Sequence, residues 1–433
     1  MLSTMDFRRG ALCSAAGGIS LRGVCGHGAD DVLGAVSVRT AGYGGASAAG
    51  GRGLTRRVVL QNFESQNFGS QNFVRRISKE EAEKMEAGAN ASAGTNVAPG
   101  APPRELLQMA DGFIVNRCLG AVAKLGVADL LANGSKSVVE LATELKVNES
   151  ALCRVLRAVA SVGVFEEMGS RVFGNNRLSH FLRSDVPGSM RARFVFGWSE
   201  FFFAPFQEIL YSVETGQPAS IKVHGMGDFE YLQQHPEQGR IFDEAMTGMS
   251  AAIGPAVAAA YDFGAWGSVM DVGGGNGMLL ASILKAHPKL RGVLADLPHV
   301  LERARQRGFL GGELEARAKM QPCDFFREVP SGCRAYVMKS VIHDWEDEKA
   351  HKILSNCRRA VPKDGALLLV EWGLEEGNQP STGKLADVAM LVLTGGRERT
   401  TDEYRELLGG AGFRLNRAVP TPTGMMVIEA LPV

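Results

Sequence analysis

The spacing of apolar and polar residues divides this chain into three stretches. Residues 1–103 are rich in Gly, Ala and Ser, a composition that buries too little apolar surface to offset the entropy of ordering the chain. From residue 104 the apolar residues recur at steps of three and four, which predicts helices. After about residue 265 short apolar runs alternate with helical patterns, which predicts a parallel sheet with helices on both faces.

The stretch 104–200 predicts a helical module that ends in a small hairpin. One amphipathic helix with a broad apolar face is expected over 104–125, and Gly126 ends its apolar spacing. Two further helices joined by a turn are expected within 137–164, followed by two short strands within 164–173. This order is the pattern of a winged helix, which serves either DNA binding or dimerisation.

Charge weighs against DNA as the partner of this module. Its second helix would present only Arg154 and Arg157 to bases, on a helix that also carries Glu149. The chain has 47 Lys and Arg against 47 Asp and Glu, so it offers no general attraction to nucleic acid or to an anionic membrane. No apolar run approaches the roughly 18 residues that span a bilayer. We therefore expect a dimerisation and substrate-lid module.

Composition also bears on the compartment. The segment 1–103 contains many arginines and serines but few acids, as organelle transit peptides do, although the pair Asp30 and Asp31 is atypical of them. The alternative is a disordered N-terminal leader that carries no targeting signal. We expect the protein in the cytoplasm, or in a plastid or mitochondrion if the leader is a transit peptide. The seven cysteines are scattered without C-x-x-C pairs, which indicates free thiols and argues against a zinc site.

A glycine-rich turn is the main candidate for a ligand site. The segment 268–277 reads S-V-M-D-V-G-G-G-N-G, which predicts a buried strand, a turn and the start of a helix. Its glycines allow positive φ and leave no Cβ in the way of a ligand. Met278 breaks the dinucleotide fingerprint, and Asp271 would repel a pyrophosphate but suits a cationic ligand. The alternative is a purely structural turn.

Two acidic residues follow later strands, where ligands bind in such sheets. Asp296 ends the second strand, where a carboxylate can accept both hydroxyls of a ribose; alternatively it caps the helix at Pro298. Asp324 precedes Phe325 and Phe326, so it could accept an adenine amine while the rings flank the base; alternatively it is an ordinary turn residue.

The fourth strand leads through Lys339 to His343. A fourth strand lies beside the first in a doubly wound sheet, so His343 would face the same crevice as the glycine turn, unless it is a structural histidine. Glu371, after the fifth strand, would accept the Nδ1 proton and leave Nε2 free to take a proton. Glu398 could approach from the other side or be a solvated loop residue. We expect no metal, because no cluster of hard oxygen ligands accompanies the histidine.

Aromatic and methionine residues are dense between 190 and 265. Such side chains usually form core, but beside a ligand domain they also suit the walls of a pocket for a flat, apolar substrate.

Five motifs in this order resemble those of the cation-independent small-molecule O-methyltransferases, typified by the plant caffeic acid type and by hydroxyindole and bacterial antibiotic relatives. The motifs are Asp271 to Gly277, Asp296-Leu297-Pro298, Asp324-Phe325-Phe326, Lys339 to Trp345, and Gly395 to Arg399. The resemblance implies a Rossmann-like methyltransferase sheet over 201–433, with pocket helices at about 201–264, behind a mostly helical winged-helix dimerisation domain over 104–200.

The resemblance also implies a cofactor, a base and a substrate class. S-adenosylmethionine would be held by Asp271, Gly273, Gly275, Asp296, Asp324, Phe325 and Lys339. His343 would be the general base, flanked by Glu371 and Glu398, which matters because a phenol with a pKa near 10 is scarcely ionised at neutral pH. The acceptor would be a hydroxyl on a small aromatic molecule, and the enzyme a homodimer. N- or C-methylation and a non-catalytic dimeric regulator are the alternatives.

Overall fold

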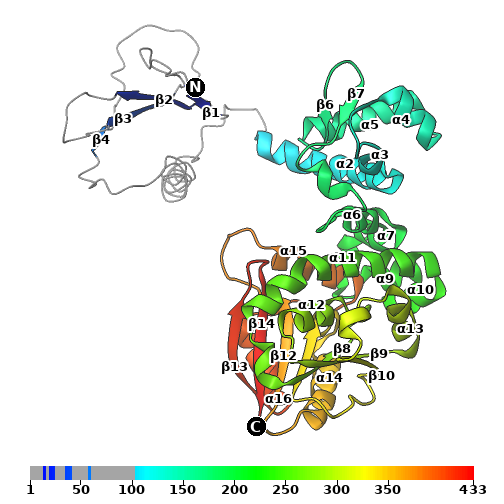
Figure 1. The fold of residues 1–433 in the computed structure, drawn as a ribbon, viewed down its shortest axis with the longest axis vertical. Helices are drawn as coiled ribbons and strands as arrows, with labels where there is room; N and C mark the ends of the chain where they lie inside the picture. Colours follow the sequence, from blue (N-terminus) through cyan, green and yellow to red (C-terminus); the bar gives the residue numbers. More distant parts are fainter. Residues whose placement is uncertain (1–12, 16–18, 25–34, 41–56, 60–102) are drawn as a thin grey trace. The chain divides into compact units, whose positions relative to one another are not determined.

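The computed structural model describes residues 103–433 and, before them, four short strands (Figure 1). These strands are β1 (Cys13–Ala15), β2 (Ile19–Val24), β3 (Ala35–Thr40) and β4 (Arg57–Val59), and they form an antiparallel sheet in that order. They belong to a separate compact unit, and the chain from 102 to 433 forms the other. The strands were not expected, and the predicted disorder of 1–103 otherwise concerns positions outside the described residues.

The first part of the larger unit is the predicted winged helix. Its elements are α2 (Arg104–Leu125), α3 (Val127–Leu130), β5 (Lys136–Ser137), α4 (Val138–Leu145), α5 (Glu149–Ser161), β6 (Glu166–Glu167) and β7 (Val172–Gly174). The three strands form a sheet in the order β5-β7-β6. Ser137 begins α4 with a capping box and Asn148 caps α5, which accounts for the turn between them.

Helix α2 is only partly buried. Its last turns pack Val122 and Ala123 into the core of the module. The apolar residues of its first half are exposed, and Met109 reaches 75%. These exposed residues, which we call the α2 apolar face, are Leu106, Leu107, Met109, Phe113 and Ile114. The expected apolar face therefore exists, but its first half stays largely exposed, although Phe113 stacks on Phe203. Contiguous exposed apolar surface of this kind marks an interaction site.

A series of helices connects this module to the sheet. They are η1 (Ser179–Leu182), α6 (Arg191–Trp198), α7 (Glu200–Gln207), α8 (Ile209–Thr215), α9 (Ala219–His224), α10 (Asp228–Gln234) and α11 (Pro236–Ala260). Several of the predicted aromatic residues pack together here, with Phe196 and Phe201 against Phe242. Tyr231 stacks on Phe201 in the same cluster. These rings form a core, whereas Phe229 is exposed and stacks on Trp345.

A seven-stranded sheet makes up the rest of the unit, in the order β10-β9-β8-β11-β12-β14-β13. Its elements in chain order are η2 (Phe263–Trp266), β8 (Ser268–Val272), α12 (Met278–Ala286), β9 (Arg291–Asp296), α13 (Pro298–Arg307), η3 (Gly312–Leu314), β10 (Ala318–Pro322), β11 (Ala335–Lys339), η4 (Ile342–Asp344), α14 (Asp347–Ala360), β12 (Ala366–Trp372), α15 (Thr382–Leu393), α16 (Thr401–Gly410), β13 (Phe413–Pro420) and β14 (Met425–Pro432).

Five strands are parallel, and β11 pairs with both β8 and β12. The predicted neighbour relation between the first and fourth strands is therefore confirmed. The expectation of an entirely parallel sheet is wrong for its end, because β14 runs antiparallel to β12 and β13. The reason is local: only the turn around Gly424 separates β13 from β14, and so short a connection can join only antiparallel strands.

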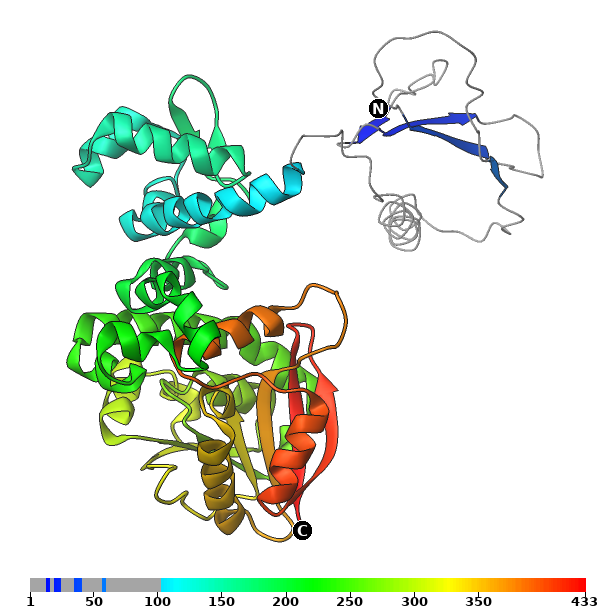
Figure 2. The same cartoon turned by 180° about the vertical axis from the view of Figure 1, so that it is seen from behind.

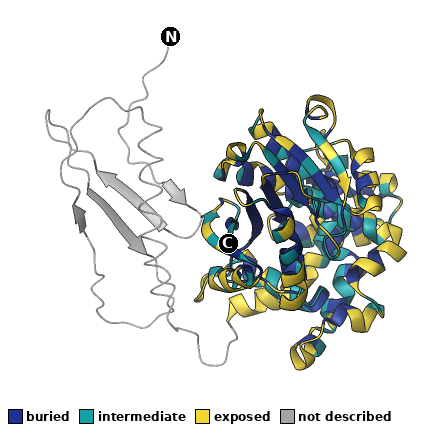
Figure 3. Cartoon of the chain, turned by 90° about the horizontal axis from the view of Figure 1, so that it is seen from below, coloured by how far each residue is buried: buried dark blue, intermediate teal, exposed yellow. Residues whose placement is uncertain are grey.

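Both faces of the sheet are covered, as Figures 1 and 2 show, with α11 and α12 on one side and α14 and α16 on the other. Every residue of β12 is buried, which explains why all of them except Glu371 are apolar. The buried interior appears as the dark blue strands of Figure 3. Each fully buried leucine or valine contributes roughly 1.5 to 3 kcal/mol.

The carboxyl ends of β8, β9, β11 and β12 lie at one edge of the sheet, because these strands are parallel neighbours. No helix among the described residues is long and apolar enough to cross a membrane.

Candidate active site

The glycine turn after β8 requires glycine for two different reasons. Gly273, Gly275 and Gly277 have φ values of 70°, 58° and 80°, a left-handed conformation that other residues adopt at a cost. At Gly274 the limit is space, since a Cβ there would lie 2.6 Å from Cγ of Asp271. At Gly275, by contrast, a Cβ would meet nothing within 4 Å. The backbone of the turn therefore requires glycine, and the space beside Gly275 is open to a ligand.

Asp271 is a buried carboxylate without a hydrogen-bond partner. It is almost fully buried at the end of β8, and neither of its oxygens has a partner among the described residues. Burial raises the pKa of Asp271 to about 7, although the positive charge of the nearby Lys339 on β11 opposes this rise. Burial also lowers the pKa of Lys339, whose Nζ donates to Oγ of Ser340 at 3.2 Å. An unpaired buried carboxylate fits a ligand that brings hydrogen-bond donors or positive charge.

Asp296 joins the end of β9 to the glycine turn. Its Oδ2 accepts the backbone N–H of Gly275 at 2.9 Å, and its Oδ1 accepts that of Leu297 at 2.7 Å. Neither of these N–H groups belongs to α13 (Pro298–Arg307), so the alternative of Asp296 as the cap of that helix is wrong. Burial raises the pKa of this carboxyl, while its two backbone hydrogen bonds lower it.

Phe325 lies against the same turn. Its ring carbon Cε1 is 3.4 Å from the position that a Cβ on Gly273 would occupy, and Val341 is at 3.1 Å. Its carbonyl oxygen accepts a hydrogen bond from Asn356 on α14 at 2.7 Å, which fixes the loop. The Asp324 carboxylate accepts the N–H of Phe326 at 3.0 Å, as the turn-residue alternative predicts. Phe325 thus lies against the glycine turn, whereas one carboxylate oxygen of Asp324 is used in a hydrogen bond within its own loop.

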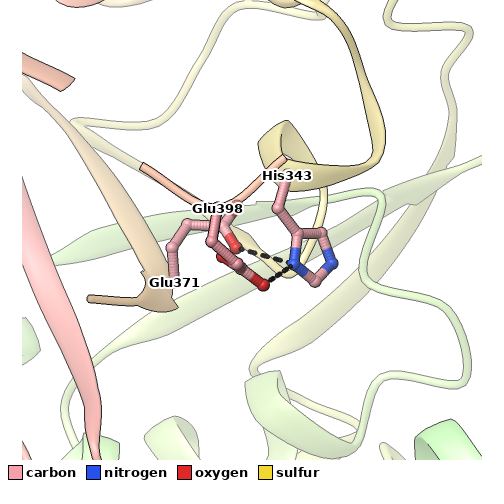
Figure 4. A group of neighbouring side chains, drawn as sticks. All are labelled: His343, Glu371 and Glu398. Atoms are coloured by element: carbon pink, nitrogen blue, oxygen red, sulfur yellow. Dashed lines mark hydrogen bonds and ion pairs between the residues drawn. The ribbon is translucent and has the colours of Figure 1, made fainter. Parts of the chain in front are cut away.

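His343 and two glutamates form a buried cluster at the same sheet edge (Figure 4). Nδ1 of His343 is 2.7 Å from Oε1 of Glu398 and 3.8 Å from Oε2 of Glu371. The hydrogen-bond acceptor is therefore Glu398, and the prediction that Glu371 fills this place is wrong. Glu398 is only 2% exposed, so the alternative of a solvated loop residue is also wrong.

Glu371 instead holds the turn that carries the histidine. Its Oε1 accepts the backbone N–H of Val341 at 3.2 Å and of Ile342 at 3.0 Å. These groups begin η4, and the first N–H groups of a helical turn have no partner within the turn itself. Because β12 lies beside β11, the carboxylate of Glu371 near the end of β12 lies next to these two N–H groups. The other oxygen of each glutamate, Oε2, has no hydrogen bond among the described residues.

The charges around His343 favour a protonated imidazole. Burial alone would lower the pKa of His343, but Glu371, Asp344 and Glu398 outweigh it and raise this pKa to about 10. Burial raises the pKa of Glu371 to about 7, and that of Asp344 to about 6. The cluster therefore holds a proton at neutral pH, shared among interacting groups.

The cluster also has the spacing of a metal site, since ligand atoms of His343, Glu371 and Glu398 lie within 4.8 Å of one another. Our premise that no oxygen ligands accompany the histidine is therefore wrong. However, Nδ1 and Oε1 of Glu398 are hydrogen-bonded to each other, and Oε1 of Glu371 is occupied by two N–H groups. A shared proton satisfies this arrangement, and the absence of a metal stays a prediction.

Two residues of this site were not singled out from the sequence. Asp344 lies 3.6 Å from Nε2 of His343, and the motif H-D-W could have indicated it. Arg399 is fully buried and donates to the carbonyl oxygens of Ile342 and Trp345. It follows Glu398 directly, but a run of charged residues usually indicates a solvated loop.

Two sequence models of known families match this chain. A model of an O-methyltransferase domain matches residues 206–414, and a model of an O-methyltransferase dimerisation domain matches residues 107–185. Phenazine O-methyltransferase PhzM of Lysobacter antibioticus is 42% identical over 328 residues, which cover 76% of this chain and 96% of that protein. The chain belongs to the O-methyltransferase family. It is an S-adenosylmethionine-dependent O-methyltransferase, and the resemblance seen in its motifs is confirmed.

Other relatives of this O-methyltransferase differ in the atom they methylate. An O-methyltransferase from neocarzinostatin biosynthesis, solved with S-adenosylmethionine and 2-hydroxy-5-methyl naphthoic acid, is 31% identical, with a TM-score of 0.66 over 78% of this chain and 100% of that one. The 8-amino-8-demethylriboflavin N,N-dimethyltransferase of Streptomyces davaonensis is 34% identical over 316 residues, 72% of this chain and 90% of that protein. The comparisons thus establish the fold, the cofactor and the dimerisation domain.

The geometry of the cluster predicts the effect of removing one carboxylate. Glu398→Gln should lower the pKa of His343 by roughly 1 to 3, because a nearby negative charge stabilises the imidazolium by that amount. The measurement is an NMR titration of the histidine ring signals, with His343 assigned from its loss in His343→Gln. Glu376→Gln removes an exposed carboxylate and is the matched control. An unchanged His343 pKa in Glu398→Gln would contradict the electrostatic account.

Proposed function

We propose that this enzyme methylates a hydroxyl of a small, flat aromatic molecule, with His343 as general base. The observation that supports this most directly is the 2.7 Å hydrogen bond between Nδ1 of His343 and Glu398, at the same sheet edge as the glycine turn. It holds the ring by one nitrogen and leaves Nε2 as the nitrogen that can face an acceptor.

The residues at the glycine turn fit S-adenosylmethionine, which supplies an activated methyl group when bound. In our proposal the unpaired carboxylate of Asp271 and the open space at Gly275 receive its methionine end, near Gly273 and Lys339. Asp296 accepts the ribose hydroxyls.

The adenine contacts in this proposal come from the next loop. Phe325 flanks the base, and Asp324 accepts its amine through the oxygen not used in the turn. All of these residues lie at or just after the carboxyl ends of parallel strands, where such sheets bind ligands.

His343 takes the acceptor proton in this proposal. The hydroxyl proton moves to Nε2 as the oxygen becomes the nucleophile, while Nδ1–H stays bound to Glu398. Glu371 and Asp344 stabilise the imidazolium that results, which is why the pKa of His343 is raised to about 10. Because this pKa lies well above neutral pH, only the fraction of enzyme with a deprotonated His343 ring takes the proton, and this fraction grows as the pH rises. Alignment of acceptor and methyl group accounts for the remaining acceleration.

The class of acceptor follows from the relatives and from the aromatic surroundings. Relatives are named for phenazine and naphthoate substrates, which are flat and aromatic. In this chain the rings of Phe229 and Trp345 stack beside the His343 turn, so a planar molecule would find aromatic neighbours there. A relative named for N,N-dimethylation favours amine methylation as the second candidate. In that case His343 would only position the acceptor.

Removal of the base should reduce turnover without affecting the cofactor. In His343→Gln we expect kcat to fall by roughly 10² to 10⁴, the usual contribution of general base catalysis, with unchanged affinity for S-adenosylmethionine. In the wild type, kcat/KM should rise with pH well above 6.5, because only the deprotonated ring acts as a base and the pKa of His343 is raised.

The assay measures methyl transfer to a panel of phenols, hydroxyindoles, flavonoids and the corresponding amines. His351→Gln, on the exposed side of α14, serves as the control. Full turnover in His343→Gln would refute the role of the base, and methylation of amines alone would favour the second candidate.

The proposed ribose contact can be tested separately. Asp296→Ala should weaken binding of S-adenosylmethionine by roughly 10- to 100-fold, because hydrogen bonds to a charged group contribute about 1.5 to 3 kcal/mol. Isothermal titration calorimetry measures the dissociation constant directly. Glu302→Ala, at an exposed position of α13, is the control. A dissociation constant equal to that of the wild type would exclude the contact.

We also propose that the enzyme is a homodimer that uses the α2 apolar face. The dimerisation model begins at residue 107, within this helix, and covers the winged helix. The double variant Leu106→Glu and Met109→Glu should be monomeric in light scattering coupled to gel filtration, since charges would be buried in the interface. Leu385→Glu, equally exposed on α15, should remain dimeric. A dimeric double variant would place the interface elsewhere. We propose domain limits at 103/104 and 200/201, and a targeting role for the leader.

A further inference from the structure

The segment that carries Glu398 lies directly against the turn that carries His343. At Gly396 an added Cβ would overlap the carbonyl oxygen of His343, and it would lie 2.6 Å from the backbone nitrogen of Trp345. The two backbones are therefore in contact, and only glycine allows this approach. Two residues further on, Glu398 bonds to the histidine ring. The contact thus determines how far the carboxylate is from the imidazole.

The side chain of Arg399 links the segment of Glu398 to the turn of His343 by hydrogen bonds. Its Nη1 donates to the carbonyl oxygen of Ile342 at 3.3 Å, and its Nη2 to that of Trp345 at 2.9 Å. These carbonyls come immediately before His343 and immediately after Asp344. One guanidinium therefore holds both sides of the histidine turn.

The backbone of Arg399 is tied to the sheet. Arg399 forms a parallel bridge with Gly373, which lies just beyond the end of β12. The same strand supplies Glu371, whose carboxylate holds the start of the turn through the N–H groups of Val341 and Ile342. The histidine turn is thus held from the sheet by a carboxylate on its N–H groups and by a guanidinium on its carbonyl groups.

The action of Arg399 on His343 is geometric rather than electrostatic. The groups that set the charge around the ring are Glu371, Asp344 and Glu398. The guanidinium charge is paired with Asp347, at 3.1 Å from Nε and 2.7 Å from Nη2. Because Arg399 is 0% exposed, its donors depend for partners on these carbonyls, on the carbonyl of Arg397 and on this carboxylate.

We propose that Arg399 is a positioning residue for methyl transfer: it holds the His343 turn against the segment of Glu398 and so sets the hydrogen bond between them. The claim that it serves catalysis rests on the proposed function of His343. A lysine cannot replace it, because a single ammonium does not present donors to two separated carbonyls and to Asp347 at once.

The test uses Arg399→Lys and Arg399→Gln in the full chain. Both should reduce kcat by about 100-fold, the effect of displacing a catalytic group by roughly 1 Å, with little change in KM or in affinity for S-adenosylmethionine. The second readout is the pKa of His343 by NMR titration. It should fall in both variants, because the hydrogen bond to Glu398 is lost.

Arg317→Gln is the matched control. Arg317 also donates to backbone carbonyls, those of Leu284, His287 and Leu290, but it precedes β10 at the opposite edge of the sheet. Its loss should lower stability and leave kcat and the His343 pKa unchanged. A change in the His343 pKa in this control equal to that in Arg399→Gln would overturn the proposal, since any loss of stability would then suffice.

The outcomes separate this proposal from the function on which it rests. If His343→Gln keeps full turnover while Arg399→Gln still lowers the His343 pKa, the general base is refuted and the positioning role stands. If Arg399→Lys or Arg399→Gln folds, binds S-adenosylmethionine normally and keeps the wild-type His343 pKa, the positioning role is overturned. If neither variant folds, Asp347→Asn decides, since it removes the half-exposed carboxylate that holds the guanidinium of Arg399. An unchanged His343 pKa in folded Asp347→Asn overturns the proposal.

Discussion

The arrangement of this site depends on burying a proton between one imidazole and several carboxylates. Ionised groups are costly to remove from water unless partners replace the water. Here Glu398 takes Nδ1–H, and two backbone N–H groups occupy one oxygen of Glu371. These partners come from β12, from the turn after β11 and from the segment before α16, so the cluster forms only when all three are in place. Its geometry is therefore a property of the folded sheet edge.

The sequence predicted which residues meet at this edge better than it predicted how they bond. Strand ends can be read from apolar runs, and a parallel order places Asp271, Asp296 and His343 at one edge. The acceptor of Nδ1 was misassigned because Glu398 is 55 residues from His343 and follows no strand. No spacing rule gives the distance of a loop carboxylate from a ring. The burial of Arg399 cannot be predicted for a related reason. It depends on the carbonyl oxygens of a turn that is distant in the sequence.

The strands at the sheet margins carry the weakest signals in the sequence. β10 reads A-K-M-Q-P and is largely exposed, so only its place before Asp324 indicates it, without the apolar run that marks a central strand. β13, at the outer margin of the sheet, mixes apolar and polar residues irregularly and has a register shift between Leu415 and Arg417, so no regular period indicates it in the sequence. The helical module was predicted more completely, because the helix periods and the caps at Ser137 and Asn148 are local signals. Local signals therefore predict most helices and strands, whereas the exposed strands at the margins of the sheet lack such signals.

The bond between Asp296 and the N–H of Gly275 has a consequence for the proposed ribose contact. It fixes the rotamer of the carboxylate in the protein itself, so in the proposed site a diol would meet an acceptor that is already oriented, and no side-chain entropy of the aspartate would be lost. The same bond makes the diol contact sensitive to residues that never touch it. A substitution that bends the glycine turn would rotate the carboxylate away, and affinity for the sugar would change although the proposed contact residue, Asp296, is unaltered.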